Sequence, residues 1–362
     1  MKKEISTSSE GLVWLEALTP KQALLYSHVY DSLRKKGFNV VVTTREHELT
    51  SKILKNHGAR SVVVGKYGGK ELSSKLQASL SRQEGLFSLF RTLDVDLFVH
   101  SSFTSPDSCR VAFGLGVPIV ALTDSPHSDK VNRLTLPLAE IVIVPSCIEN
   151  KIRKYIISPS RLITFDGVFE IIWCTNFKPS LKPLRMLNIE PYSYCIIRPA
   201  EVKASYYDYD ISHDVFLKLA AEISKHLTVV YYPRYRDQAF IARKLAEKIP
   251  NLKILENPVD MQSLEKYASC VLTGGATMAQ EAAILGTPSI TYFPKKLEVT
   301  EFLKKKGFPI LHLNSTKMLE KVVLEVIKNS EAYRKRTEKL ISKLENPLPL
   351  IIKEISELAN KR

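Results

Sequence analysis

Short uninterrupted apolar runs alternate along the chain with longer segments whose apolar residues recur every three or four positions. Residues 12–15 (Leu-Val-Trp-Leu) form one such run, and the apolar residues between Pro20 and Lys36 keep helical spacing until Gly37. Uninterrupted apolar runs are typical of strands buried on both faces, and the longer segments are typical of helices. The alternation therefore predicts an α/β fold, with parallel sheets covered by helices on both faces.

This alternation occurs twice, and each half contains enough strands for a sheet of its own. Between the two sets lies a stretch, residues 167–183, that has no clear period and carries two prolines. We predict two Rossmann-like domains that face a cleft, followed by a kinked C-terminal helix. The expected segments are an N-terminal domain 1–166, a linker 167–183, a C-terminal domain 184–315 and C-terminal helices 316–362. Residues 316–344 are expected to form one long helix.

The strands predicted for the two sheets define where a ligand is expected. In parallel sheets, ligands collect at the carboxyl ends of the strands. The predicted strands are residues 12–15, 38–43, 61–64, 96–100, 118–122 and 141–144 in the first domain, and 194–198, 228–232, 252–255, 270–273, 289–292 and 309–312 in the second.

A glycine turn in the second domain, Gly274-Gly275, lies between a predicted strand and a predicted helix. Adjacent glycines let the backbone approach a ligand closely, and the first N–H groups of a helix attract anions. Thr277 can add a hydroxyl group, and Glu281, one helical turn further on, can accept hydrogen bonds from the hydroxyls of a sugar. The turn indicates a phosphate site. An ordinary strand-turn-helix is the alternative.

Two arginines are expected at the same sheet edge as the glycine turn. Arg198 ends one predicted strand, and Arg234 follows the next. Two guanidinium groups near a helix N-terminus suit a diphosphate, because arginine binds such oxygens in a bidentate manner. Two ordinary surface ion pairs are the alternative interpretation.

Four loops of the first domain carry candidate acceptor-binding or catalytic groups. Asp124, His127 and His100 are the candidates for a general base, because each can take a proton at the end of a predicted strand. His100 could equally be a buried structural histidine, and Asp129 a helix cap. No ligand spacing typical of zinc is present, so no metal is predicted. The residues expected on the acceptor side are Thr19, Lys21, Arg45, Asp129 and Arg133.

Composition limits the classes of partner and the compartment. The chain has 362 residues, a net charge of +14 and five scattered cysteines. The positive residues are dispersed and accompany no nucleic-acid motif, so we expect no nucleic-acid partner. The scattered cysteines are expected to be reduced, as they are in a cytoplasm. No apolar run could span a bilayer, and no apolar core follows the first residues, so neither a membrane span nor a secretion signal is predicted. These features favour a cytoplasmic protein. A peripheral membrane contact stays open, and the oligomeric state is not predicted.

Several segments resemble a largely archaeal family of domains of unknown function, numbered 354, and more broadly the glycosyltransferase B fold. The resemblance covers nearly the whole chain. It is carried by residues 18–22 (Leu-Thr-Pro-Lys-Gln), 42–45 (Val-Thr-Thr-Arg), 110–118 (Arg-Val-Ala-Phe-Gly-Leu-Gly-Val-Pro), 132–139 (Asn-Arg-Leu-Thr-Leu-Pro-Leu-Ala) and 274–283 (Gly-Gly-Ala-Thr-Met-Ala-Gln-Glu-Ala-Ala). In glycosyltransferases of this fold, the nucleotide lies on the C-terminal domain, and acceptor and catalytic groups come from the N-terminal one.

A weaker resemblance links the chain to UDP-N-acetylglucosamine 2-epimerases that do not hydrolyse their substrate. Those enzymes have His-Gly-Asp-Thr where this chain has His100-Ser101-Ser102-Phe103, so the acid of that motif is missing. They also have a histidine-arginine motif where this chain has Arg198 and Pro199. Asp124 and Asn132-Arg133 fall where the epimerases have comparable residues.

The sequence thus predicts a glycosyltransferase that uses a nucleotide-diphosphate sugar and needs no metal or other cofactor. The diphosphate would be bound by Gly274, Gly275, Thr277, Arg198 and Arg234. Glu281 would accept hydrogen bonds from the ribose or sugar. The acceptor, a glycan, a lipid or a small molecule, is not specified. The alternatives are a sugar-nucleotide epimerase or hydrolase, and a protein that binds a sugar nucleotide without catalysis.

Overall fold

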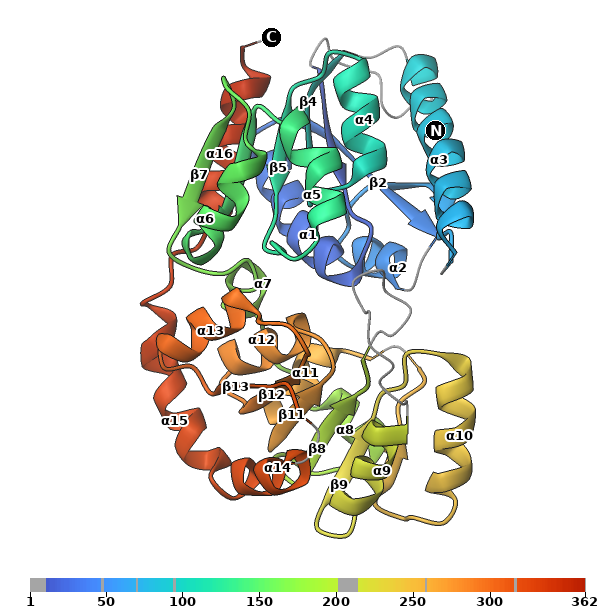
Figure 1. Ribbon diagram of the computed structural model, residues 1–362, viewed down its shortest axis with the longest axis vertical. Coiled ribbons are helices and arrows are strands. Elements are labelled where there is room, and N and C mark those ends of the chain that lie inside the picture. Colours follow the sequence, from blue (N-terminus) through green and yellow to red (C-terminus); the bar gives the residue numbers. More distant parts are fainter. Residues whose placement is uncertain are drawn as a thin grey trace. The chain divides into compact units, whose positions relative to one another are not determined.

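The computed structural model describes residues 11–46, 49–69, 71–93, 96–200, 214–257, 259–315 and 318–361. The chain divides into two compact units, which are shown in Figure 1. The first comprises Met1–Trp173 together with Glu345–Arg362, and the second comprises Cys174–Leu344. The stretch expected as a linker, 167–183, therefore contributes its first seven residues to one unit and the remainder to the other.

The first unit is built on a seven-stranded parallel sheet of order β3-β2-β1-β4-β5-β6-β7. Its strands are β1 (Leu12–Glu16), β2 (Asn39–Glu46), β3 (Ser61–Lys66), β4 (Leu97–Ser102), β5 (Ile119–Leu122), β6 (Ile141–Pro145) and β7 (Arg161–Phe165). The last strand was not predicted, because its Arg161 and Thr164 interrupt the apolar run that marked the other strands.

Helices cover both faces of this sheet (Figure 1). On one face, α3 (Leu72–Leu93), α4 (Pro106–Gly114) and α5 (Asp129–Thr135) pack in sequence order. On the other, α1 (Pro20–Lys35) contacts α2 (Thr50–Asn56) and α16 (Leu348–Ala359). The shorter elements are α6 (Glu149–Ile152), α7 (Ile171–Cys174) and the 3-10 turns Leu136–Leu138, Ser146–Ile148 and Arg153–Tyr155.

The second unit is built on a six-stranded parallel sheet of order β10-β9-β8-β11-β12-β13. Its strands are β8 (Tyr194–Arg198), β9 (Thr228–Tyr231), β10 (Leu252–Ile254), β11 (Cys270–Thr273), β12 (Ser289–Tyr292) and β13 (Ile310–Leu313). Its helices are α8 (Lys182–Leu187), α9 (Asp214–Ile223), α10 (Arg236–Ala246), α11 (Met261–Tyr267), α12 (Thr277–Ile284), α13 (Glu298–Lys305), α14 (Leu319–Lys328) and α15 (Ser330–Ile341).

Alternate residues of β8 contribute to two separate apolar clusters, one on each face of this sheet. Cys195 and Ile197 pack with buried residues of α9 and α14. Tyr194 and Ile196 pack with buried residues of α11 and α12. Because helices cover both faces, a ligand is expected at the carboxyl ends of the strands and not on a face of the sheet.

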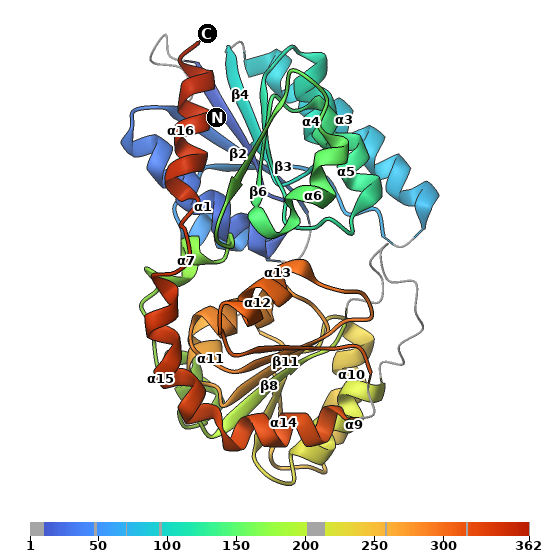
Figure 2. The same ribbon diagram turned by 60° about the vertical axis from the view of Figure 1, so that its left-hand side comes forward.

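The C-terminal segment returns from the second unit to the first. Helix α16 packs against α1 and β4 (Figure 2). Its Ile351 and Ile355 are fully buried. The prediction of a single helix over 316–344 is wrong, because α14 ends at Lys328 and α15 begins at Ser330. The apolar spacing itself lapses between Ile327 and Leu340. Within the described ranges, every helix is too short or too polar to cross a bilayer.

Candidate functional site

The glycine turn of the second unit is packed tightly against the segment that leaves β8. Strands β8 and β11 are neighbours, with Arg198 paired to Thr273, and the Gly274 N–H donates to the Arg198 carbonyl over 3.0 Å. A Cβ on Gly274 would lie 2.4 Å from Ala200 Cα, too close for any other residue. Gly274 is therefore required by the packing of the turn itself.

Both predicted arginines lie beside this turn. Arg234 Nε donates to the Pro199 carbonyl over 2.8 Å, and its Nη2 would lie 3.3 Å from a Cβ on Gly275. The guanidinium of Arg198 stacks on Tyr232, 4.0 Å from the ring centroid. The guanidinium of Arg234 thus lies beside Gly275, and Arg198, whose backbone is hydrogen-bonded to Gly274, carries its guanidinium over Tyr232 at the same end of the sheet. This combination can bind an anion with several oxygens.

Helix α12 starts directly after the glycine turn, with Thr277 as its first residue. Thr277 is half-buried, whereas every residue from Met278 to Ile284 is buried. The Gly275 carbonyl accepts a hydrogen bond of 2.8 Å from Thr291 Oγ1, which fixes the turn. The part of α12 that a ligand can reach is therefore its start, at Thr277, where the N–H groups of a helix lack partners within the helix.

A buried carboxyl group beside this site, Glu265 of α11, was not predicted from the sequence. Glu265 is fully buried, and within the described part of the chain neither of its carboxyl oxygens has a hydrogen-bond partner. Burial raises its pKa well above the ordinary value, the nearby Glu281 raises it further and Arg198 opposes the shift. Glu281 is itself only 8% exposed. Two carboxyl groups therefore lie behind the glycine turn, within electrostatic reach of Arg198.

At the corresponding edge of the first unit, one lysine joins two carboxylates from distant parts of the chain. Lys21 of α1 pairs with Asp124, which follows β5, and with Glu170, which follows β7, the second at 2.6 Å. Burial lowers the pKa of Lys21, but the two carboxylates outweigh it, and the net shift is upward. Burial raises the pKa of Glu170, and Lys21 opposes this. Sequence reasoning missed Glu170, because it lies in the stretch expected as a linker.

His100 lies inside the first unit. It is fully buried against Trp14, with Nδ1 3.1 Å from the Trp14 carbonyl and Nε2 3.0 Å from Ser108 Oγ. Burial lowers its pKa to about 3, so the ring is neutral at ordinary pH. With both nitrogens engaged, His100 cannot take a proton from a substrate. It belongs to the core, which removes it from the candidates for a general base.

The remaining predicted residues of the first unit lie around this edge in separate contacts. Thr19 caps α1, accepting from the Gln22 N–H over 3.4 Å. Asp129 pairs with Arg133 at 2.9 Å and accepts from Tyr155 rather than joining Lys21. His127 is half-buried in the loop after Asp124. Of the described residues, no three histidines, cysteines or carboxylates are grouped so as to hold a metal ion.

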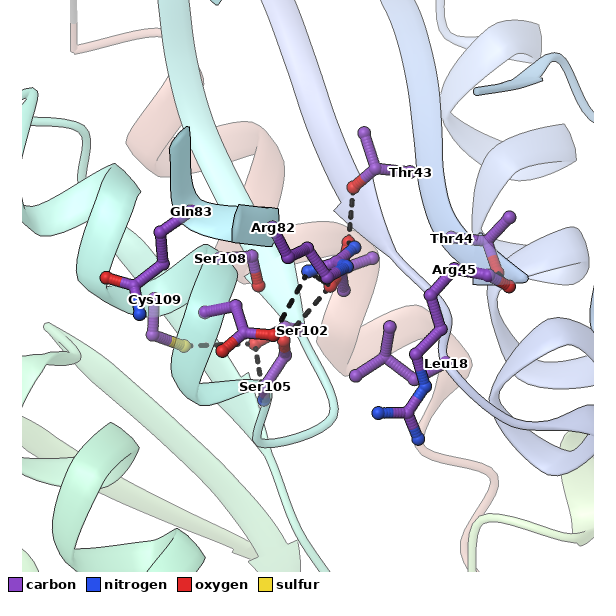
Figure 3. Close-up of polar contacts among 12 residues, drawn as sticks. Leu18, Thr43, Thr44, Arg45, Arg82, Gln83, Ser102, Ser105, Ser108 and Cys109 are labelled. Atoms are coloured by element: carbon purple, nitrogen blue, oxygen red, sulfur yellow. Dashed lines mark hydrogen bonds and ion pairs between the residues drawn. The ribbon is translucent and has the colours of Figure 1, made fainter. Parts of the chain in front are cut away.

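A second buried ion pair lies at the ends of β1, β2 and β4 (Figure 3). Arg82 of α3 contacts both oxygens of Glu16, at 2.8 and 3.0 Å, and both residues are buried. Thr43 and Ser105 donate hydrogen bonds to the same carboxylate. Glu16 is thus fully paired. In Figure 3, Arg45 extends from the end of β2 past Leu18 and away from this pair.

Comparisons with known proteins extend over nearly the whole chain. The model of a family described as "Protein of unknown function (DUF354)" matches residues 12–360. An uncharacterized protein of Methanocaldococcus jannaschii, MJ0665, is 25% identical over 316 residues, which are 84% of this chain and 88% of that protein.

Solved structures share the fold at low sequence identity. The UDP-GlcNAc 2-epimerase of Neisseria meningitidis, solved with UDP-GlcNAc bound, matches with a TM-score of 0.71 and 16% identity, over 97% of this chain and 100% of that one. The spinosyn forosaminyltransferase SpnP matches with a TM-score of 0.63 and 13% identity, over 97% and 100%. The fold is therefore of the glycosyltransferase B type, as predicted.

The packing around the glycine turn predicts different outcomes for two neighbouring substitutions. Gly274→Ala should lower the free energy of unfolding by about 1–3 kcal/mol, because its Cβ meets backbone atoms that must move. Gly275→Ala is the matched control and should cost less than about 1 kcal/mol, because its Cβ meets only the end of the flexible Arg234 side chain. Urea denaturation followed by circular dichroism measures both. Equal losses would contradict this description of the turn.

Proposed function

The chain belongs to the DUF354 family of proteins of unknown function, and we propose that it is a glycosyltransferase whose donor is a nucleotide-diphosphate sugar. The observation that carries this proposal is the convergence of Arg198 and Arg234 on the glycine turn before α12. Guanidinium groups and free helix N–H groups are complementary to a diphosphate. That the structurally similar Neisseria enzyme was solved with UDP-GlcNAc bound supports a sugar nucleotide as the ligand.

In this proposal, the diphosphate lies over Gly274 and Gly275. Thr277 donates its hydroxyl, and the first N–H groups of α12 point at the phosphate oxygens. Glu281, which is 8% exposed, lies in the buried part of α12, so its predicted contact with the ribose or sugar hydroxyls is left out of this proposal. A diphosphate that leaves the sugar gains negative charge on its departing oxygen. Arg198 and Arg234 stabilise that charge, and they act most strongly where it develops in the transition state.

Asp124 is the proposed general base, which takes the proton of the acceptor hydroxyl as the new glycosidic bond forms. Its side chain is 10% exposed, so it can meet a substrate, and Lys21 and Ser125 hold it in one orientation. Lys21 is in turn fixed by Glu170. His127 lies three residues further along the same loop and is the other candidate for this role.

A sugar-nucleotide epimerase is the second candidate, and the contact of Lys21 with two carboxylates favours it. Such an enzyme needs two groups that handle protons near the sugar, and Asp124 and Glu170 meet at one lysine. Hydrogen exchange with the solvent distinguishes an epimerase from a glycosyltransferase. In D₂O without an acceptor, an epimerase exchanges the hydrogen on the sugar carbon that it inverts. A glycosyltransferase leaves that hydrogen in place.

The diphosphate role of Arg234 predicts a selective loss of nucleotide binding. Arg234→Ala should weaken the binding of UDP, or of whichever nucleoside diphosphate binds best, by about tenfold to a hundredfold, the effect of losing one charge-assisted hydrogen bond. Arg236→Ala removes an exposed arginine two residues away and should leave the affinity unchanged. Isothermal titration calorimetry measures both, with thermal unfolding as a check on folding. Equal affinities in the two variants would remove Arg234 from the site.

Assigning the base to Asp124 predicts a loss of turnover without a loss of donor binding. Asp124→Asn should slow release of the nucleoside diphosphate from the donor by about a hundredfold to ten-thousandfold. Its calorimetric dissociation constant for the nucleoside diphosphate should match that of the unmodified protein. Asp31→Asn, which alters an exposed carboxylate of α1, is the control and should retain turnover. Full turnover in Asp124→Asn would transfer the assignment to His127.

A further inference from the structure

The amino-terminal half of α3 is exposed, although it carries leucines at helical spacing. Leu72, Leu76 and Leu80 are 71%, 61% and 56% exposed, and Phe87 is 42% exposed. Every residue from 72 to 81 is exposed or half-buried, and the first buried side chain of the helix is that of Arg82. The helix lies at the rim of the first unit (Figure 1). Single exposed leucines are ordinary, whereas a contiguous group of them marks a surface that another molecule covers.

These four apolar residues form one stripe along the helix. A step of four residues is slightly more than one helical turn, so Leu72, Leu76 and Leu80 follow a single ridge. Phe87 lies seven residues after Leu80 and returns to the same face, because seven residues make about two turns. The exposed apolar stripe is therefore continuous over about four turns of α3.

The helix surface beside this stripe is nearly free of charge. Of the ten residues 72–81, only Lys75 is charged, and the others are leucine, serine, glutamine and alanine. In the whole chain, 25% of the residues are charged, and the net charge is +14. Depletion of charged residues is characteristic of the core of a protein–protein interface. A helix that lies on a membrane instead flanks its apolar face with lysine and arginine. The composition of α3 therefore favours a protein partner.

The outermost strand of the sheet adds a second uncovered surface beside this helix. Among the described residues, β3 pairs only with β2, so its other edge has no strand beside it. The strand carries three successive valines, and Val63 is 52% exposed. A hollow of about 830 Å³ is lined by both elements, with Val63 and Gln77 among its residues. Because Gln77 directly follows Leu76, the hollow adjoins the stripe. The α3–β3 face comprises Val63, Leu72, Leu76, Leu80 and Phe87.

We propose that the α3–β3 face binds a second copy of the chain and forms a twofold dimer. In a twofold interface the same surface meets itself, so it must be complementary to itself. A strongly charged patch would repel its own copy, whereas an uncharged apolar ridge does not. Two ridges of this spacing interdigitate when two helices cross at about −50°. Leu76, the middle leucine of the ridge, lies nearest the twofold axis.

The exposed area is of the size that a dimer needs. The exposed parts of the five side chains amount to roughly 500 Å² per copy, if a large apolar side chain contributes on the order of 200 Å² when fully exposed. Each partner buries about 800 Å² in a typical stable interface, which includes a polar rim around the apolar core. The serines and glutamines beside the stripe, together with the open edge of β3, supply such a rim.

Sedimentation velocity of the full chain measures the proposed dimer directly. The unmodified protein should be dimeric at roughly 10 µM. Leu76→Glu combined with Leu80→Glu should weaken the dimer by at least about a hundredfold, because the interface would bury unpaired carboxylates. Phe240→Glu combined with Ile241→Glu is the matched control, because it alters two exposed apolar residues of α10, and it should leave the dimer intact. Circular dichroism checks that both variants are folded.

Two results of this experiment would overturn the proposal. One is an unmodified protein that stays monomeric at roughly 100 µM. The other is a Leu76→Glu, Leu80→Glu variant that dimerises as strongly as the unmodified protein.

A cysteine at the centre of the stripe identifies the partner. Leu76→Cys should form a disulfide-linked dimer under mild oxidation, because the twofold axis brings the two copies of residue 76 together. Lys353→Cys, at an exposed position of α16 in the same unit, is the control and should stay uncrosslinked. The native cysteines give little background, because four are buried and Cys147 is half-buried. Equal cross-linking of both variants, or none in Leu76→Cys, would contradict the assigned axis and the dimer built on it.

Flotation with phosphatidylglycerol vesicles tests a membrane as the occupant of the same face. The unmodified protein and the Leu76→Glu, Leu80→Glu variant should float to the same extent, because the α3–β3 face is covered by the second copy. Loss of vesicle binding in the variant would assign this face to a membrane and contradict the dimer.

Discussion

The close approach of Gly274 to Ala200 is the constraint on which the candidate donor site depends. The segment after β8 can lie against the glycine turn only because residue 274 has no Cβ. That contact positions the Pro199 carbonyl, which accepts from Arg234, and the Arg198 carbonyl, which accepts from Gly274. Arg234 therefore lies beside Gly275, directly before the start of α12. A larger residue at position 274 would separate them, even if every charged group remained.

In the first unit, the sheet edge is organised by buried pairs of opposite charge. Glu16 is paired with Arg82, and Lys21 is paired with both Asp124 and Glu170. Burying an unpaired charge costs several kcal/mol, so such pairing is what permits charged groups at this depth. Arg45, at the end of β2, has its guanidinium stacked on the ring of Tyr67.

The sequence was sufficient for the fold, because continuous apolar runs mark buried parallel strands and Gly-Gly before a helix marks a turn. It did not predict β7, whose polar residues interrupt the apolar pattern. It also missed Glu170 and Glu265. A carboxylate in an irregular segment or a short helix carries no local sign of burial, and only the tertiary packing brings it to a lysine or an arginine. For His100, the sequence left a catalytic and a buried structural role open, and only the packing of its ring against Trp14 decides for the structural one.

We propose that the edge formed by Gly274, Gly275, Arg198 and Arg234 binds a diphosphate. Calorimetric titration of the unmodified protein with UDP, GDP and ADP, each alongside its monophosphate, tests this site. At least one diphosphate should bind, and its monophosphate should bind at least about tenfold more weakly, because one set of charge-assisted hydrogen bonds is lost. Failure of all three diphosphates to bind at millimolar concentration would contradict a diphosphate site at this edge, as would equal affinity for mono- and diphosphate.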